Sequence, residues 1–288
     1  MIGFDLNKTK RHFIEVLCDG FTRREAEQLM RILLEDFFEV DRKKELMNPH
    51  LRIDEFQYSL LENAVKQLLE GVPVQYVTRK AWFDGLLFYV DQSVLIPRPE
   101  TEELVQLVAE DRAIEDRPLR IWDVGTGSGC IAIALAKRIP KAELVAFDVS
   151  EKALVTAKMN TLINNVKVDL VCDDVLHPKS ELWQQPVDIV VSNPPYIRES
   201  ERVAMESNVV DHEPSQALFV PDDDPLLFYR QILTLAKPQL SPNGSVWFEI
   251  NEAMGQEKIQ LCEQMGFEAE LYEDFAGKPR FCKGKLIM

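Results

Sequence analysis

The sequence predicts an α/β protein in which a doubly wound, Rossmann-like sheet of seven strands follows a small N-terminal helical bundle and a connecting β-hairpin. Three patterns predict this fold class. Apolar residues recur at helical spacing over the first 70 or so residues, aromatic and β-branched residues then flank an Asp84-Gly85 turn, and helical and strand patterns alternate from Glu100 onward. Such alternation is typical of βαβ units, in which helices cover both faces of a parallel sheet. With 288 residues, 46% of them hydrophobic, the chain is long enough for two modest domains.

Residues 1–73 are expected to form the helical bundle. Thr22 and Glu25 have the spacing of a capping box, and a second helix is expected to begin near Asp54 and to end at Gly71. The two helices carry apolar stripes, which are Ala26, Leu29, Met30, Leu33, Leu34 and Phe37 in the first and Phe56, Leu60, Ala64, Leu68 and Leu69 in the second. The stripes are expected to pack against each other; the functional alternative is that they form a surface that binds a partner.

Residues 74–99 are expected to form a β-hairpin linker, because Asp-Gly between apolar runs is a strong hairpin signal. Residues 100–288 are expected to form the sheet domain. The sequence predicts strands at 121–124, 144–147, 168–171, 189–191 and 245–250, helices at 130–138 and 152–162, a helix opened by Asp224-Pro225 and a helix that ends at Gly266. Two further strands near Leu271 and Cys282 have no helix between them, so an antiparallel pair is expected to close the sheet.

Composition excludes several classes of function. Lys and Arg number 33 and Asp and Glu number 48, which gives a formal net charge of −15 at pH 7. Because affinity for nucleic acid comes largely from neutralising phosphates, direct nucleic-acid binding is not expected. The longest apolar runs are short and the first residues lack a signal-peptide pattern, so a cytoplasmic protein that binds no membrane is expected. The five cysteines are scattered and include no C-x-x-C pair, so no metal site is predicted.

The first functional motif is the glycine-rich loop Gly125-Thr126-Gly127-Ser128-Gly129, which connects a predicted strand to a predicted helix. In a doubly wound sheet, ligands bind outside the carboxyl ends of the strands, and glycines allow the backbone to approach a ligand closely. The loop is not a G-x-x-x-x-G-K-[ST] phosphate loop. The dinucleotide pattern G-x-G-x-x-G would need a glycine where Cys130 stands, so a pyrophosphate site is disfavoured.

Acidic residues end the next two strands. Asp148 lies about 20 residues beyond the glycine loop, where a carboxylate can accept hydrogen bonds from the hydroxyls of a ribose; the alternative is that it caps the next helix together with Ser150. After the third strand, Asp173-Asp174 either lies beside an adenine ring or caps a helix. Any cofactor that contains adenosine would use groups of this kind.

The most specific motif is Asn193-Pro194-Pro195-Tyr196, which follows the fourth strand. Two prolines fix the backbone and remove two N–H donors, so carbonyl oxygens and the Asn193 amide oxygen are left as acceptors. Several acceptors together suit a planar NH2 group, which they would align toward an electrophilic methyl, and Tyr196 would offer a ring face to the substrate. The alternative is a structural turn in which Asn193 only closes a loop.

The glycine loop and Asn193-Pro194-Pro195-Tyr196 together resemble S-adenosylmethionine-dependent methyltransferases that act on NH2 groups. The chain also resembles one branch of them, the HemK/PrmC family, in the stretches 94–102, 212–214, 217–219 and 248–251 and in its helical N-terminal part. Members of this family methylate the glutamine of the Gly-Gly-Gln motif in peptide-chain release factors. One difference is visible, since the family often has glycine in the stretch after Gln75-Tyr76, where this chain has Thr78-Arg79.

The resemblance implies a seven-stranded methyltransferase sheet, S-adenosyl-L-methionine as cofactor with S-adenosyl-L-homocysteine as product, and release factors as protein substrates docked by residues 1–73. It implies cofactor contacts at Gly125, Thr126, Gly127, Ser128, Gly129, Asp148, Asp174, Val175 and Asn193. It implies that Asn193, Pro194, Pro195 and Tyr196 hold the glutamine amide.

Three other functions are compatible with parts of the pattern. An adenine N6-methyltransferase would also present an NH2 group to Asn193, but the net charge of −15 argues against it. A non-catalytic scaffold that binds the cofactor is disfavoured because the glycines, Asp148 and Asn193 are all present. An NAD-dependent oxidoreductase is disfavoured by the glycine spacing.

Overall fold

The computed structural model describes residues 3–111, 117–205 and 207–287. These residues form two compact units, one made of residues 3–80 and 207–212 and the other of residues 81–205 and 213–287. No helix within the described ranges is long and apolar enough to span a membrane.

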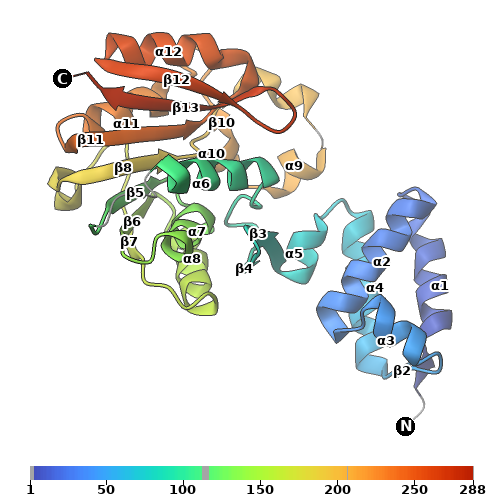
Figure 1. The fold of residues 1–288 in the computed structure, drawn as a ribbon. Coiled ribbons are helices and arrows are strands. Elements are labelled where there is room, and N and C mark those ends of the chain that lie inside the picture. Colours follow the sequence, from blue (N-terminus) through green and yellow to red (C-terminus); the bar gives the residue numbers. More distant parts are fainter. Residues whose placement is uncertain (1–2, 112–116, 206, 288) are drawn as a thin grey trace. The chain divides into compact units, whose positions relative to one another are not determined.

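The first unit is a helical bundle (Figure 1). Its helices are α1 (Leu6–Leu17), α2 (Arg23–Phe38), α3 (Arg42–Met47), α4 (Glu55–Leu69), α5 (Val74–Thr78) and α9 (Ser207–His212). The two-residue strands β1 (Phe4–Asp5) and β2 (Arg52–Ile53) pair antiparallel. Buried side chains from α1, α2 and α4, among them Phe13, Met30 and Val65, form its core. The bundle is held together by packing of these amphipathic helices, because helices of such length are marginal in isolation.

The caps predicted for the bundle are confirmed, but one predicted stripe is partly wrong. Thr22 and Glu25 form the capping box of α2, and Asp54 accepts a hydrogen bond from the Gln57 backbone at the start of α4. Phe56 is 77% exposed and Leu69 is 39% exposed, although both were expected to face the core. The buried face of α4 instead consists of Leu61, Ala64, Val65 and Leu68. Their spacing leaves Phe56 off this face, whereas Leu69 has the spacing of the face but is the last residue of the helix. The helix α1 was not predicted.

The predicted hairpin is confirmed and consists of β3 (Lys80–Phe83) and β4 (Leu86–Tyr89). Asp84 and Gly85 have φ of 51° and 71°, the left-handed conformation that a two-residue hairpin turn requires. Helix α8 (Glu151–Ile163) and the residue that follows it bind the edge of β4. Asn160 of α8 bonds both the N–H and the C=O of Tyr89, and Asn164, the C-cap of α8, donates to the C=O of Leu87.

The short helix α5 precedes the hairpin, in a stretch where the sequence predicted a hairpin alone. This helix ends at Arg79, which has φ of 59°. Arg79 therefore adopts a left-handed conformation in the stretch where the resembled family often has glycine, the residue that takes this conformation at least cost.

The second unit is built on a seven-stranded sheet with the order β12-β13-β11-β8-β5-β6-β7. The strands are β5 (Arg120–Val124), β6 (Glu143–Asp148), β7 (Asp169–Cys172), β8 (Val187–Ser192), β11 (Leu240–Glu249), β12 (Phe267–Glu273) and β13 (Pro279–Leu286). All neighbouring pairs from β11 to β7 are parallel, whereas β13 is antiparallel to β11 and to β12. The doubly wound sheet with an antiparallel end pair is thus confirmed.

Helices cover both faces of this sheet (Figure 1). On one face lie α6 (Pro99–Asp111), α7 (Cys130–Arg138) and α8, and on the other lie α11 (Leu227–Ala236) and α12 (Gly255–Gln264). Smaller elements follow β8, where β9 (Ile197–Arg198) pairs in parallel with β10 (Phe219–Val220) and α10 (Ser215–Leu218) precedes β10. Short 3₁₀ helices lie at Glu181–Gln184, Glu199–Ala204 and Glu252–Met254.

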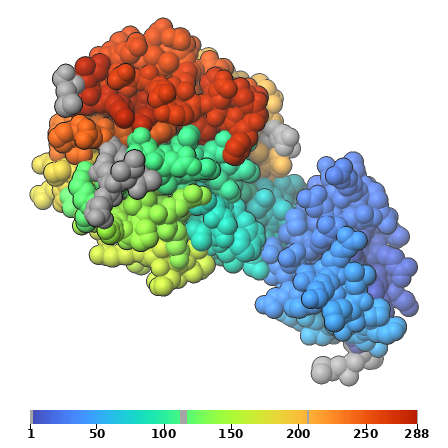
Figure 2. Space-filling model, viewed as in Figure 1, coloured from blue at the N-terminus to red at the C-terminus, as the bar shows by residue number. Residues whose placement is uncertain are grey.

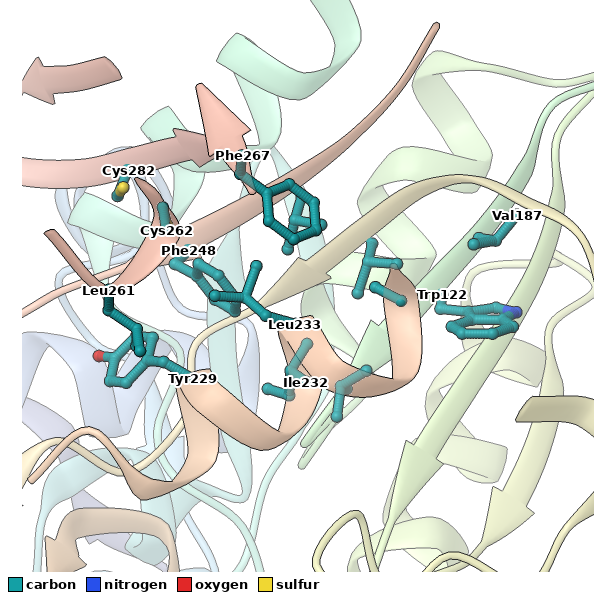
Figure 3. Close-up of a cluster of buried hydrophobic side chains, with 14 of the residues drawn as sticks. Trp122, Val187, Tyr229, Ile232, Leu233, Phe248, Leu261, Cys262, Phe267 and Cys282 are labelled. Atoms are coloured by element: carbon teal, nitrogen blue, oxygen red, sulfur yellow. The ribbon is translucent and has the colours of Figure 1, made fainter. Parts of the chain in front are cut away.

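The core beneath α11 and α12 is close-packed. Figure 3 shows Tyr229, Ile232 and Leu233 projecting from α11 toward the sheet, with Phe248 of β11 and Phe267 of β12 on the opposite side. Trp122 of the central strand β5 belongs to the same cluster. In Figure 2, the atoms of α12, β12 and β13, coloured orange-red to red, form a continuous region of the surface of this unit. The apolar face of the sheet is therefore covered up to its antiparallel end.

Asp188 ties three strands together at the amino end of the sheet. Its carboxylate in β8 accepts hydrogen bonds from the Arg117 guanidinium at 2.6 and 3.0 Å, from the Arg120 backbone at 2.9 Å and from the Ser241 hydroxyl at 2.5 Å. Burial alone would raise the pKa of Asp188, but these hydrogen bonds and the charge of Arg117 outweigh it and lower the pKa to about 2. The contacts therefore favour the folded state while the carboxylate is ionised.

We expect Asp188→Asn to lower the free energy of unfolding of the sheet-containing unit by about 2 kcal/mol at pH 7, since a shift from 3.8 to about 2 corresponds to that magnitude. Because the pKa is lower in the folded state, the contribution of Asp188 is present above pH 4 and is lost as the pH falls toward 2. Urea denaturation at pH 7 and pH 3 measures the loss of stability and its dependence on pH. The exposed Asp169→Asn in β7 is the charge-matched control, and an equal loss for Asp188→Asn at both pH values would contradict the assignment.

Candidate active site

The candidate site lies where three parallel strands end. Val124, the last residue of β5, is paired with both Phe147 of β6 and Ser192 of β8, and the Ser192 hydroxyl donates to the Val124 carbonyl at 2.6 Å. The residues that follow these paired positions are the glycine loop, Asp148 and Asn193. The sheet register therefore brings together three motifs that are separated in the sequence, as expected at the carboxyl edge of a doubly wound sheet.

A cavity of about 380 Å³ opens at this edge and lies wholly within the second unit. Most of the residues predicted for the site line it; these are Gly125, Thr126, Gly127, Ser128, Asp148, Asp174, Val175, Asn193, Pro194 and Pro195. The rest of the wall comes from residues in the segments 93–101 and 214–219, from α11, and from neighbours of the predicted residues at the ends of β5, β6 and β8 and the starts of α7 and α8. A volume of this size is typical of a small-molecule site.

Two predicted residues do not line the cavity, and each has another contact. A Cβ atom on Gly129 would lie 3.2 Å from the Ala157 Cβ and 3.1 Å from the Ile133 Cδ1, so Gly129 allows α7 and α8 to pack closely. Tyr196 packs against the core cluster, and its hydroxyl contacts Glu249 at 3.3 Å. The structure thus gives both residues a place in the packing around the site.

The glycine loop leaves open space beside its backbone. Gly125 and Gly127 have φ of 76° and 55°, and a Cβ on either would meet no atom of the described chain within 4 Å. The loop is held from behind by Asp123, whose carboxylate accepts from the Thr126 hydroxyl at 2.6 Å and from the Ala132 N–H at 3.2 Å. Burial raises the pKa of Asp123 to about 7 in spite of these hydrogen bonds. The loop therefore forms a fixed cradle with room for a ligand against its backbone.

Asp148 is bonded to the glycine loop as well as to the next helix. One carboxylate oxygen accepts from the Gly127 N–H at 2.8 Å and the other from the Ser150 N–H at 2.9 Å. The helix α8 is capped by the Ser150 hydroxyl, which accepts from the Ala153 N–H. Burial raises the pKa of Asp148. A carboxylate oxygen has two lone pairs, so each Asp148 oxygen retains acceptor capacity toward the cavity.

The two acidic residues after β7 have different contacts. Asp173 accepts hydrogen bonds from the backbone of Lys179 and Ser180 and from the Trp183 indole N–H, so it closes the loop that follows the strand. Asp174 accepts from the Leu176 N–H at 2.9 Å and lies 2.8 Å from the His177 ring. The turn from Asp174 to Leu176 forms one wall of the cavity.

Asn193 is connected to two residues whose roles the sequence did not indicate. Its Nδ2 donates to the Thr101 hydroxyl oxygen at 3.3 Å, and the Thr101 hydroxyl donates to Glu249 at 2.6 Å. Glu249 is 2% exposed, and burial raises its pKa. A charged residue at the end of an apolar strand such as Val246–Glu249 is the signal that could have indicated a site, because a buried carboxylate needs partners.

A second buried acid organises the segment that precedes α6. Glu213 accepts from the Arg98 guanidinium at 2.5 Å and from the Ile96 N–H at 3.3 Å, and its side chain is 1% exposed. Arg98 itself lines the cavity. Its partner Glu213 was not singled out from the sequence as a site residue, since 115 residues separate the two.

Comparisons with known proteins agree with this architecture. Residues 101–215 match the family model of the methyltransferase small domain, and residues 20–78 match that of the PrmC N-terminal domain. A methyltransferase from Pyrococcus furiosus of known structure has a TM-score of 0.52, with 17% identity over 78% of this chain and 100% of that chain. The fold is therefore that of a methyltransferase, and the matched family model is that of a methyltransferase domain.

Two curated relatives specify the family. The release factor glutamine methyltransferase of Flavobacterium psychrophilum is 43% identical over 95% of this chain and 96% of its own length. That of Bacteroides thetaiotaomicron is 39% identical over 96% of this chain and 98% of its own length. The chain belongs to the family of release factor glutamine methyltransferases.

Two variants, one at Asp148 and one at Ser150, distinguish binding in the cavity from the capping of α8. We expect Asp148→Ala to weaken binding of S-adenosylhomocysteine about ten- to a hundredfold, because charge-assisted hydrogen bonds contribute on the order of 1.5 to 3 kcal/mol. Ser150→Ala removes the hydroxyl that caps α8, at a residue that also borders the cavity, and is expected to lower stability by about 1 kcal/mol with a smaller loss of affinity than Asp148→Ala. Calorimetric titration and thermal unfolding of both variants measure this. Equal affinity of wild type and Asp148→Ala would leave Asp148 with a purely structural role.

Proposed function

We propose that the protein transfers a methyl group from S-adenosylmethionine to the side-chain amide nitrogen of the glutamine in the Gly-Gly-Gln motif of peptide-chain release factors. The observation that carries this proposal is the position of Asn193-Pro194-Pro195 in the same cavity as the glycine loop and Asp148. A motif rich in acceptors beside a cofactor cradle suits transfer to an NH2 group. The names of the relatives support the choice of substrate. Release factors act in translation, so the proposed location is the cytoplasm.

The residues present fit S-adenosylmethionine. The open space beside Gly125 and Gly127 accommodates a ligand in contact with the backbone, and the remaining lone pairs of Asp148 suit the hydroxyls of a ribose. The turn with Asp174 and Val175 would border the adenine ring. When bound, this cofactor supplies an electrophilic methyl group on a sulfonium.

The contribution of Asn193 and Pro194 is to orient the acceptor nitrogen. An amide nitrogen is a poor nucleophile because its lone pair is delocalised, so its position matters more than its basicity. The Asn193 Oδ1 and the Pro194 carbonyl would accept its two N–H groups, and Pro194 and Pro195 have no N–H of their own to compete. The nitrogen proton becomes acidic only as the N–C bond forms, so no strong base is required beforehand.

The direct test is incubation of a purified release factor with the protein and S-adenosylmethionine, followed by peptide mass spectrometry. We expect one added methyl group on the Gly-Gly-Gln glutamine and none on a release factor with that glutamine changed to asparagine. An adenine-containing oligonucleotide tests the alternative acceptor. Methylation of the oligonucleotide alone, or cofactor binding without any transfer, would favour the alternative functions instead.

Asn193→Ala tests the proposed role of the motif. We expect kcat to fall roughly thirty- to a thousandfold, because loss of acceptor hydrogen bonds in a water-excluded site costs about 2 to 4 kcal/mol in the transition state. Affinity for S-adenosylhomocysteine is expected to change little, since the glycine loop and Asp148 are intact. Single-turnover assays and calorimetry measure the two effects, and wild-type turnover would remove Asn193 from the reaction.

We further propose that the helical bundle docks the release factor. A Gly-Gly-Gln tripeptide offers little surface, so affinity for a whole protein requires contacts outside the cavity. The bundle presents large apolar side chains to solvent, with Leu46, Met47 and Phe56 between 70% and 77% exposed. Contiguous exposed apolar residues are typical of interaction surfaces, and Leu46 and Met47 are adjacent in α3.

The docking proposal predicts a difference between two substrates. We expect the double substitution Leu46→Ser and Phe56→Ser to raise KM for the release factor about tenfold or more while kcat/KM for a short Gly-Gly-Gln peptide stays within twofold. Val155→Ser, on the exposed side of α8, is the matched control because Val155 is 67% exposed but belongs to the second unit. Equal effects on both substrates, with circular dichroism unchanged, would remove the docking role.

A further inference from the structure

A chain of hydrogen bonds lies behind Asn193 and ends at a buried carboxylate. The Asn193 Nδ2 is 3.3 Å from the Thr101 Oγ1, which is 2.6 Å from Glu249 Oε2, and the Tyr196 hydroxyl is 3.3 Å from Glu249 Oε1. Thr101 is 3% exposed and Glu249 is 2% exposed. Thr101 borders the cavity, whereas Glu249 does not line it. Glu249 therefore acts on the site only through its neighbours.

The chemistry of the partners fixes the direction of this chain. A hydroxyl has one proton to donate, and Glu249 can only accept while it is ionised, the form that the hydrogen bonds from Thr101 and Tyr196 and the charge of Arg280 favour. A separation of 2.6 Å is the usual length of an O–H···O⁻ hydrogen bond, so the Thr101 proton is committed to Glu249. The Thr101 oxygen can then only accept from Asn193, which requires that the amide turn its NH2 group inward. The Asn193 Oδ1 is the atom left for a substrate.

We propose that Thr101 and Glu249 are positioning residues that fix the orientation of the Asn193 amide, so that Asn193 presents an acceptor to the NH2 group of the incoming glutamine. This inference depends on the proposed function for the identity of that NH2 group. A flipped Asn193 would place its own NH2 against that of the substrate, two donors facing each other. The chain of hydrogen bonds thereby favours substrates that offer a planar NH2 group over isosteric carboxylates, such as glutamate in place of the glutamine.

The first test compares Thr101→Val with Thr101→Ser. Valine keeps the shape of threonine and removes the hydroxyl, whereas serine keeps the hydroxyl. We expect Thr101→Val to lower kcat at least tenfold with affinity for S-adenosylhomocysteine within twofold of wild type, and Thr101→Ser to retain kcat within threefold. Equal kcat for wild type and Thr101→Val, or equal losses in both variants, would overturn the proposal.

The second test reverses the chain of hydrogen bonds. Asn193→Asp offers the site an acceptor but has no proton to donate to Thr101, so it is expected to lose most activity. When Glu249→Gln is added, the new glutamine amide can donate to the Thr101 oxygen, and the Thr101 proton can turn to the new aspartate carboxylate. The second carboxylate oxygen then faces the substrate. We expect the double variant to be at least tenfold more active than Asn193→Asp alone, a rescue that a merely structural role of Glu249 would not produce.

Activity of the double variant at or below that of Asn193→Asp would overturn the proposed direction of the hydrogen bonds from Asn193 through Thr101 to Glu249. Thermal unfolding and S-adenosylhomocysteine binding verify that each variant is folded. If Glu249→Gln does not fold, the Thr101 pair decides alone, since valine replaces only the hydroxyl of threonine and serine keeps that hydroxyl while losing only the methyl group.

A readout without substrate separates this inference from the proposed function. In protein labelled with ¹⁵N-asparagine, one side-chain amide proton of Asn193, assigned by its loss in Asn193→Asp, is expected to exchange slowly in wild type and in Thr101→Ser and rapidly in Thr101→Val. Equal exchange in all three would refute the orienting role whatever the substrate is. If wild type leaves the release factor unmodified but shows this pattern, the proposed substrate is wrong and the orienting chain of hydrogen bonds stands.

Discussion

The parallel pairing of β5 with β6 on one side and β8 on the other is the constraint on which the site depends. This pairing aligns Val124 with Phe147 and Ser192, so three loops distant in sequence begin side by side. A slip of one residue would invert the face to which each side chain points and would move the loops apart. The core beneath α11 resists such a slip because Trp122 and Phe248 are fitted into it from the same sheet face (Figure 3). Packing in the core beneath α11 thus determines where the three loops of the candidate site meet.

Three buried acids then hold the loops that this register brings together. Asp123 binds the glycine loop, Glu213 binds the segment around Arg98, and Glu249 binds Thr101 behind Asn193. Burying a carboxylate is unfavourable, and hydrogen bonds from the loop offset part of that cost, so each acid favours the arrangement of its loop that supplies them. The raised pKa values of Asp123 and Glu249 reflect that cost. The hydrogen bonds of these buried acids therefore determine where the walls of the cavity lie.

Local patterns predicted the fold and most of the cavity wall, because strand and helix periodicity and glycine spacing are properties of neighbouring residues. The rule that ligands bind at the carboxyl edge was enough to bring Asp148 and Asn193 to one place. Thr101 and Glu249 are 148 residues apart, and no spacing in the sequence marks such a pair. Phe56 was misassigned because an apolar residue in the first turn of a helix need not share the buried face. The docking role of the bundle stays a prediction.

The contacts of Asn160 and Asn164 with the hairpin also affect how the protein interacts with other chains. By bonding the N–H and C=O of Tyr89 and the C=O of Leu87, Asn160 and Asn164 occupy the groups that an unpaired strand edge offers to a neighbour. A two-stranded ribbon with an open edge is a template on which a strand from another chain can assemble. Here the amide side chains already bond these backbone groups of β4, so β4 is protected from intermolecular strand addition and from the aggregation that follows it.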